Sequence, residues 1–227
     1  MAQDKDRKEL LEEPDPVTIF LHRLFAFLVT HRNRLIAGGI TLAVVVIVVS
    51  GVGYFLNQAE NKAATMLGQA LEEYGAAKEG SGAPPDYEKL KADFKAVIDQ
   101  YGYTDAADLA MVQYASVLHE SGDNAAAIEM FQKAYDTFEG KAQIDNLVLN
   151  GMAYAYEAKG DVENAVSCFE KIVADNDAII KDQALFNLGR LYGQLGKADE
   201  SRGAYEKIVS DYPDSLYVEP AKMKIAG

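Results

Sequence analysis

Cysteine and histidine are scarce in this sequence of 227 residues, which has one Cys and three His. The single cysteine, Cys168, excludes an intramolecular disulfide. It stands beside Phe169 in a predicted helix, where a small core residue is expected. The histidines, His22, His31 and His119, are far apart, and neither HExxH nor a paired Cys/His spacing occurs. The sequence therefore predicts no metal site.

The short motifs that mark enzymes and cofactor sites do not occur in this sequence. It has no GxSxG nucleophile elbow, no Walker A or GxGxxG loop, and no CxxCH haem-attachment motif. Aspartate and glutamate are frequent but scattered, as expected for solvated helix faces. We therefore expect a protein that is not an enzyme, with no cofactor and no small-molecule substrate.

Basic residues are outnumbered, with 22 Lys and Arg against 35 Asp and Glu, and the formal net charge is −13. Residues 1–34 contain six residues of each sign, so the whole excess of negative charge lies after them. An acidic surface without a basic stripe repels phosphate backbones, and nucleic acid is not an expected partner. The simpler interpretation, that the acidity only keeps the domain soluble, is left open.

One long apolar run interrupts the polar sequence. No charged residue occurs between Leu35 and Ala59. At about 1.5 Å per residue, about 20 helical residues cross a hydrocarbon core of about 30 Å, so residues 35–57 are predicted to form a transmembrane helix. A cleaved signal peptide is the competing interpretation, but its apolar region spans only about 7–15 residues. We therefore expect an uncleaved anchor.

The charges that flank this run predict its orientation. Arg23, Arg32 and Arg34 precede it, whereas Lys62 is the basic residue at a similar distance after it. Because the more basic flank stays in the cytoplasm, the N-terminus is predicted to be cytoplasmic. Residues 58–227 then face the other compartment, which is the periplasm if the source is a Gram-negative bacterium. The expected localisation is the bacterial inner membrane, crossed once.

The predicted cytoplasmic segment, residues 1–34, contains a second apolar stretch. From Val17 to Leu28, apolar residues surround His22 and Arg23. This pattern predicts an amphipathic helix that lies in the membrane interface or contacts another membrane protein.

Three segments of the C-terminal part resemble one another. They begin at Gly122, Gly160 and Gly196, which are 38 and 36 residues apart, close to the tetratricopeptide period of about 34 residues. In each segment a small residue stands five positions after the glycine, and an aromatic residue follows four positions later. The small residues are Ala127, Ala165 and Ser201, and the aromatic residues are Phe131, Phe169 and Tyr205. The repeat predicts an all-α solenoid of tetratricopeptide-like helical hairpins. The alternative is an unrelated helical bundle, which is disfavoured because the pattern recurs three times at one period.

The helix before each glycine carries a matching signature of apolar and small residues. Its members are Met111, Tyr114, Ala115 and Leu118, then Leu149, Met152, Ala153 and Tyr156, then Leu185, Leu188, Gly189 and Tyr192. The small residue of each set lets the two helices of a hairpin cross closely. A degenerate upstream copy at residues 87–101 has Phe94 and Val97 in the aromatic and apolar positions, with a partner helix expected at about 60–78. A short capping helix is expected from about Val218.

In a tetratricopeptide array, the first helix of each hairpin lines a concave face through the positions between its core residues. These positions form a predicted protein-binding groove of Ser116, His119, Asn150, Tyr154, Glu157, Phe186, Arg190 and Gln194, with Val112 beside it. Their mixture of amide, aromatic and charged groups suits an extended or helical peptide. The alternative is an ordinary solvated face.

The N-terminal amphipathic segment, the single anchor and the C-terminal array ending in KMKI (222–225) resemble the YfgM-like ancillary subunits of the Sec translocon. That resemblance implies an inner-membrane interaction scaffold, partnered with translocon subunits, a membrane-anchored foldase or nascent polypeptides, that assists secreted-protein translocation or folding. The segment YEKIVSDYPDSLYVEPAKMK also resembles repeats of the Tol-Pal-associated division coordinators, and an envelope adaptor of division or peptidoglycan machinery is the alternative. A third hypothesis is regulation of a cytoplasmic factor through residues 1–34.

Overall fold

A computed structural model describes residues 16–79, 85–138 and 142–226, and all regular secondary structure in these residues is α-helical. The chain divides into two compact units, residues 1–57 and residues 58–227. The all-helical architecture agrees with the fold class predicted from the repeats.

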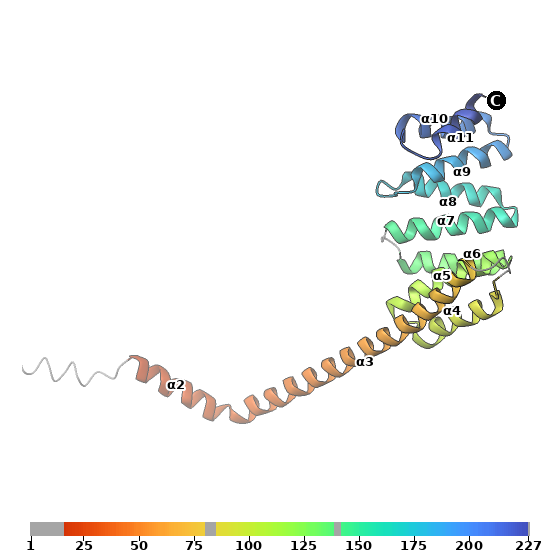
Figure 1. The fold of residues 1–227 in the computed structure, drawn as a ribbon. Coiled ribbons are helices and arrows are strands. Elements are labelled where there is room, and N and C mark those ends of the chain that lie inside the picture. Colours follow the sequence, from red (N-terminus) through yellow and green to blue (C-terminus); the bar gives the residue numbers. More distant parts are fainter. Residues whose placement is uncertain (1–15, 80–84, 139–141, 227) are drawn as a thin grey trace, which may run out of the picture. The chain divides into compact units, whose positions relative to one another are not determined.

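The first unit contains α2 (Pro16–Thr30) and the N-terminal part of α3 (Arg32–Glu79), drawn in red to orange in Figure 1. His31 alone separates the two helices. Its N–H donates to the Phe27 carbonyl (3.0 Å) and its carbonyl accepts from the Leu35 N–H (2.9 Å). Within the described residues, α3 is the one helix whose length and composition suffice to cross a membrane, with a mean hydropathy of 2.6 over its apolar window.

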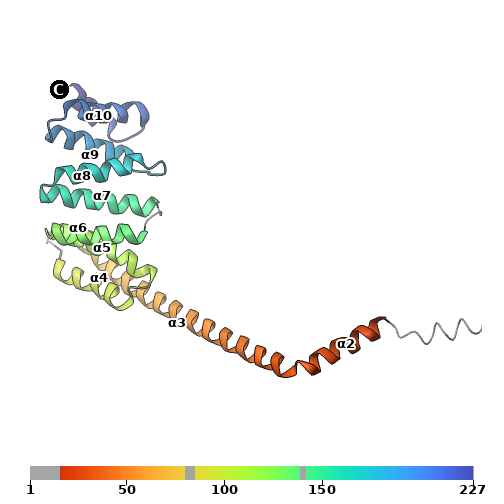
Figure 2. The same ribbon diagram turned by 180° about the vertical axis from the view of Figure 1, so that it is seen from behind.

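The second unit begins with the C-terminal part of α3 and continues through eight shorter helices. These are α4 (Tyr87–Tyr101), α5 (Asp105–Glu120), α6 (Asn124–Phe138), α7 (Ala142–Lys159), α8 (Val162–Ala174), α9 (Lys181–Gln194), α10 (Ala198–Asp211) and α11 (Val218–Ala226). From α4 onward each helix packs against the next one along the chain, and the hairpins stack in sequence order, as Figures 1 and 2 show from opposite sides. The expected capping helix from Val218 is confirmed as α11.

Three glycines turn the chain between the two helices of a hairpin. Gly122, Gly160 and Gly196 have φ values of +88°, +84° and +73°, in the left-handed region that glycine adopts without a steric penalty. At the middle turn the Gly160 N–H donates to the Glu157 carbonyl and the Asp161 N–H donates to the Tyr156 carbonyl, each at 2.9 Å. These bonds satisfy carbonyls at the end of α7. The glycine turns predicted from the sequence are therefore confirmed.

Small and aromatic residues share the core between the helices. Ala115, Ala127, Ala153 and Ala165 are fully buried and belong to the same core cluster as the fully buried Phe169.

The last hairpin, α9 and α10, closes most tightly at Gly189, where a Cβ atom would lie 2.6 Å from Cζ of Tyr205. In the same hairpin the Ser201 hydroxyl donates to the Gly189 carbonyl at 2.6 Å. A second close approach, Gly151 against the Phe131 ring, was not predicted from the sequence.

The first hairpin of the second unit differs from the prediction in one respect. The expected helix at about 60–78 is not separate, because α3 runs without a break from Arg32 to Glu79. No Pro occurs in that span, and the polar residues after Asn57 include good helix formers. The degenerate copy predicted at residues 87–101 is confirmed as α4, whose Phe94 and Val97 are fully buried against α3 and α5.

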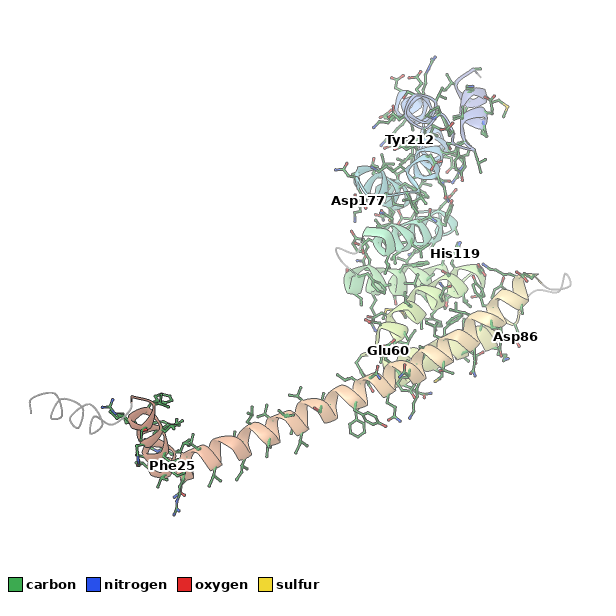
Figure 3. All side chains as sticks on the ribbon, turned by 60° about the vertical axis from the view of Figure 1, so that its left-hand side comes forward. Phe25, Glu60, Asp86, His119, Asp177 and Tyr212 are labelled. Atoms are coloured by element: carbon green, nitrogen blue, oxygen red, sulfur yellow. The ribbon has the colours of Figure 1, made fainter. Side chains whose placement is uncertain are left out.

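Side-chain contacts fix the second-unit part of α3 against α5. The Glu60 carboxylate accepts from the backbone N–H groups of Asp105 (2.9 Å) and Ala106 (3.1 Å), which would otherwise be unpaired at the start of α5 (Figure 3). Toward the other end of α3, the Tyr74 hydroxyl donates to Oε1 of Glu120 at 2.7 Å.

Candidate protein-binding face

The predicted groove residues lie on the first helices of three successive hairpins. Ser116 and His119 belong to α5; Asn150, Tyr154 and Glu157 to α7; Phe186, Arg190 and Gln194 to α9. Whether they bind a partner is a proposal, but their surroundings show which of them are already engaged within the chain.

A polar network joins α7 to α9 and contains three of the predicted residues. The Tyr154 hydroxyl oxygen accepts from Nε2 of Gln183 (3.1 Å) and from Nδ2 of Asn187 (3.0 Å). Glu157 and Arg190 form a two-pronged ion pair, in which Nη1 donates to Oε1 and Nη2 donates to Oε2 at 2.7 Å. Nη2 of Arg190 also donates to Oδ1 of Asn187 at 3.1 Å.

This network has a defined electrostatic character. The hydrogen bonds from Arg190 to Glu157 raise the pKa of the guanidinium above its ordinary value, so the arginine stays charged throughout the accessible pH range. Because both side chains are partly shielded from water, the two-pronged pair is held more firmly than a typical surface ion pair. The network is therefore a preformed polar surface between the second and third repeats.

Two members of this network, Gln183 and Asn187, were missed by the sequence analysis. Gln183, Asn187 and Arg190 stand at i, i+4 and i+7, a spacing that places them on one face of α9. That spacing could have predicted that Gln183 and Asn187 lie beside Arg190. The contacts of these three residues to Tyr154 and Glu157 could not be predicted from the sequence, since they depend on how two repeats stack.

Phe186 is less available than predicted. Its ring stacks on Tyr217 with the centroids 5.1 Å apart, and meets Tyr205 edge-on at 5.6 Å. The segment that carries Tyr217 is held by a hydrogen bond from the Ser215 hydroxyl to Oδ2 of Asp182 (2.6 Å). The connection into α11 thus covers this aromatic side chain.

The remaining predicted residues do not join the network. The Ser116 hydroxyl donates to the Val112 carbonyl (3.1 Å), and Nδ1 of His119 lies 2.7 Å from Oδ1 of Asn124. Gln194 is exposed.

Asn150 lies one turn before Tyr154 on α7 and is half-buried. Its Oδ1 atom is buried and accepts no hydrogen bond within the part of the chain that the structure describes.

Two further features bear on chemistry. No group of three or more His, Cys, Asp or Glu side chains that could hold a metal ion occurs among the described residues. Cys168 is buried, and burial raises the pKa of its thiol to about 11, so it is not a ready nucleophile at neutral pH.

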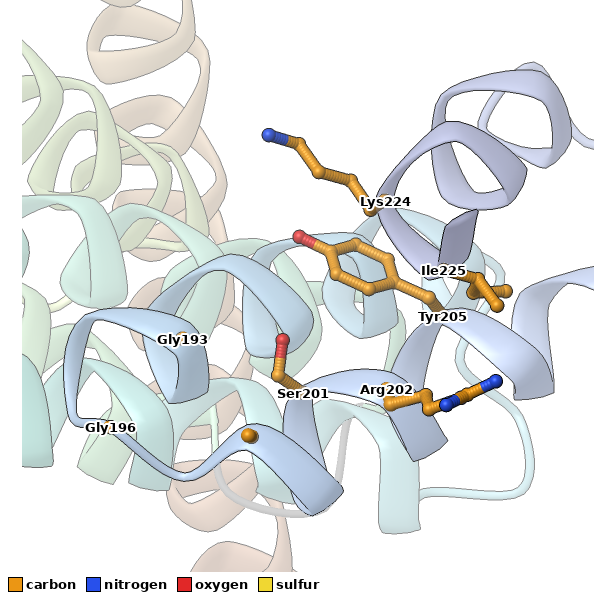
Figure 4. A pocket seen from close by; sticks show the side chains of 8 residues that line it. Gly193, Gly196, Ser201, Arg202, Tyr205, Lys224 and Ile225 are labelled. Atoms are coloured by element: carbon orange, nitrogen blue, oxygen red, sulfur yellow. The ribbon is translucent and has the colours of Figure 1, made fainter. Parts of the chain in front are cut away.

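A pocket of about 310 Å³ lies between the α9–α10 turn and α11 (Figure 4). Its lining includes Ser201, Arg202, Tyr205 and Lys224 and contains none of the predicted groove residues.

Comparison with known proteins identifies the repeats. Residues 110–137 and 148–174, and separately residues 183–215, match tetratricopeptide repeat families. A TPR repeat-containing protein of Acanthamoeba polyphaga mimivirus is 34% identical over 76 residues, which is 32% of this chain and 21% of that protein. The chain thus spans about a fifth of that relative's length.

Solved structures show the same fold. A tetratricopeptide repeat protein from Parabacteroides merdae has a TM-score of 0.56 at 17% identity, covering 71% of this chain and 59% of that one. A structure of TPR-like repeats from Podosopora anserina, which are nearly identical to one another, has a TM-score of 0.59 to this chain at 16% sequence identity. The match covers 72% of this chain and 84% of that one. The matches at residues 110–137, 148–174 and 183–215, together with the shared helical fold, identify these segments as tetratricopeptide repeats, which indicate a protein–protein interaction scaffold.

Proposed function

We propose that the chain is a membrane-anchored protein–protein interaction scaffold of a bacterial inner membrane that assists the translocation or folding of secreted proteins at the Sec translocon. The proposal of a membrane anchor is supported by one observation: the apolar part of α3 exposes its side chains, and 0% of its most apolar stretch is buried within the protein. Such a surface is stable in lipid and unfavourable in water.

The proposed topology places the N-terminus in the cytoplasm and residues 58–227 in the periplasm. It is supported by Arg23, Arg32 and Arg34 before the apolar segment and by Lys62 alone at a similar distance after it.

The proposed role of α2 is to lie in the membrane interface. Phe20, Leu24 and Leu28 are exposed on one side of this helix, and His22 is on the opposite side, where Ile19 and Val29 are exposed as well, since successive residues are about 100° apart. This distribution suits a helix that contacts lipid over most of its circumference. The alternative is that α2 contacts a protein partner in the membrane.

The proposed binding surface is the groove on α5, α7 and α9. Stacked first helices give a long surface for an extended or helical polypeptide, and the ordered network around Tyr154 and Arg190 lowers the entropic cost of binding to it. The translocon and a membrane-anchored foldase are proposed as partners on the resemblance to the YfgM-like subunits. An envelope adaptor of division or peptidoglycan machinery is the alternative.

Photo-crosslinking in living cells tests the proposal. A crosslinking amino acid replaces Val45 in the apolar segment, the exposed Gln194 in the groove, or the exposed Lys133 on α6 as a control away from the groove. We expect position 45 to trap translocon subunits, position 194 to trap a foldase or secreted chains, and position 133 to trap neither. Capture of division or cell-wall proteins at position 194, with no translocon subunit at position 45, would replace this proposal by the adaptor function.

A further inference from the structure

Exposed apolar side chains of the second unit are concentrated at one edge of the stack. Among its described residues, the exposed large apolar side chains are Leu71, Tyr103, Leu109, Leu147, Ile179, Leu216 and Met223. Five of these lie in the connections that lead into α5, α9 and α11 or in the first two turns of α5 and α7. We call Tyr103, Leu109, Leu147, Ile179 and Leu216 the apolar edge.

The topology brings these five residues to one side of the molecule. Because successive helices are antiparallel, α5, α7, α9 and α11 all begin at the same end of their hairpins. Figures 1 and 2 show the α8–α9 and α10–α11 connections on the same side as the start of α7. Hydrogen bonds link neighbouring parts of this edge: Asn146 Nδ2 donates to Oδ2 of Asp175 at 2.6 Å, and the Ser215 hydroxyl donates to Asp182.

The apolar edge is continuous with the predicted groove. Leu147, Asn150 and Tyr154 stand at i, i+3 and i+7 on α7, so they lie along one face of that helix. The same spacing of seven residues relates Leu109 to Ser116 on α5. A polypeptide bound in the groove can therefore extend over the edge without leaving the surface of the first helices.

The segments that carry the apolar edge are strongly acidic. In residues 101–109, 142–148, 174–184 and 211–219 the acidic residues are Asp105, Asp108, Asp145, Asp175, Asp177, Asp182, Asp211, Asp214 and Glu219, and the basic residue is Lys181. Figure 3 shows Asp177 in the α8–α9 connection, two residues before Ile179. Carboxylates in a first helical turn stabilise the helix dipole, which gives several of them a structural reason, yet their summed field still makes this edge negative.

We propose that the apolar edge docks a cationic, apolar polypeptide segment in an extended conformation, with apolar residues that meet the edge and Lys or Arg residues that meet its carboxylates. Apolar side chains exposed singly need no explanation, but five along one edge indicate a contact surface. The negative charge selects the occupant, because it repels acidic polypeptides and anionic lipid and attracts basic polypeptides. The inference rests on the proposed scaffold function and specifies the chemistry of one partner.

Geometry favours an extended ligand. The five apolar side chains are distributed along the stack from the start of α5 to the start of α11. An extended chain rises about 3.3 Å per residue, against about 1.5 Å in a helix, so it spans this length with fewer residues and can alternate apolar side chains with basic ones.

Peptide binding to the full chain in nonionic detergent micelles tests the proposal. The probe is a fluorescein-labelled peptide of repeated Lys-Leu-Ser triplets, followed by fluorescence anisotropy with empty micelles as the blank. The test variant is the double substitution Ile179→Ser and Leu216→Ser, since these side chains are 84% and 92% exposed and contribute little to folding. The matched control is Met223→Ser on α11, which is 70% exposed and lies outside the edge.

We expect the double variant to bind the peptide about tenfold more weakly than the parent, because it removes apolar side chains that contact the peptide. The Met223→Ser control should bind within about twofold of the parent, because Met223 lies outside the apolar edge. A peptide with Glu in place of Lys should not bind, and raised salt should weaken binding of the Lys peptide. Equal affinity of the double variant and the parent, an equal loss in the control, or equal binding of the Glu peptide would overturn the docking site. The scaffold function would still stand in those cases if the crosslinker at position 194 traps its partners.

Discussion

Replacing Gly189 by alanine probes a close helix crossing within the last hairpin, α9 and α10. A Cβ atom at this buried position would lie 2.6, 2.7 and 2.9 Å from Cζ, Cε1 and Cε2 of Tyr205, distances that real Cβ contacts do not show. The ring cannot move away easily, because its centroid lies 5.6 Å from that of Phe186, which itself stacks on Tyr217. The added methyl group must therefore force α9 and α10 apart or tilt the ring.

The magnitude follows from two opposed effects. Alanine in place of glycine within a helix contributes about 1 kcal/mol of stability. Overpacking of a filled core by one methyl group costs about 1–3 kcal/mol, and contact with an aromatic ring on several atoms argues for the upper value. We therefore expect Gly189→Ala to destabilise the array by about 2 kcal/mol.

The matched control is Gly203→Ala on α10, in the same hairpin. Gly203 is exposed and its Cβ would meet no atom within 4 Å, so only the gain in helix propensity remains and the variant should be about 1 kcal/mol more stable than the parent. Urea unfolding of the full chain in micelles, followed by far-ultraviolet circular dichroism, measures both. With a denaturant slope of about 2 kcal/mol per molar, the midpoints should move by about −1 M and +0.5 M respectively.

Equal midpoints for the two variants would refute the reasoning, since both make the same chemical change in a helix. Combining Gly189→Ala with Tyr205→Leu gives an independent check. Removal of the ring should make the alanine nearly harmless, and an undiminished loss in that background would show that the ring is not the obstacle.

Three further predictions concern the turns, the polar network and the cysteine. Gly160→Ala should destabilise the array by about 1 kcal/mol in the same urea assay because φ is +84° there, and an unchanged midpoint would contradict a positive-φ requirement. Arg190→Ala should cost about 1 kcal/mol, a value discounted for partial exposure, and Glu157→Ala made together with it should add little; additive losses would mean that the two side chains do not act as a pair. Burial raises the pKa of Cys168 to about 11, above an unfolded value of about 8.5, so its contribution to stability is complete below about pH 8.5 and is lost as the pH rises toward 11. The difference in unfolding free energy between the parent and Cys168→Ala should fall over that interval, and a flat difference would contradict the burial of the thiol.

Much of the fold was readable from the sequence because its causes are local. A glycine with positive φ ends a helix wherever it stands, so Gly122, Gly160 and Gly196 marked the turns without knowledge of the rest. The fixed spacing from each glycine to a small and then an aromatic residue likewise follows from helical periodicity, and Phe131 and Phe169 are buried as that spacing requires.

The candidate groove was only partly readable. Helical spacing placed Tyr154, Glu157 and Arg190 on the first helices, but could not show that they bond to one another. That contact joins residues 33 positions apart, and depends on the rotation of one hairpin against the next. The covering of Phe186 by Tyr217 has the same origin.

The sequence by itself determined the helices, their turns and the repeat, since φ preferences, small residues and apolar periodicity act within a hairpin. Only the tertiary structure decided that Gly151 faces the Phe131 ring, that Tyr217 covers Phe186, and that exposed apolar side chains gather at one edge. The physical reason is that these outcomes depend on close packing between hairpins, where sub-ångström fits between side chains distant in sequence decide which surfaces are filled and which stay open.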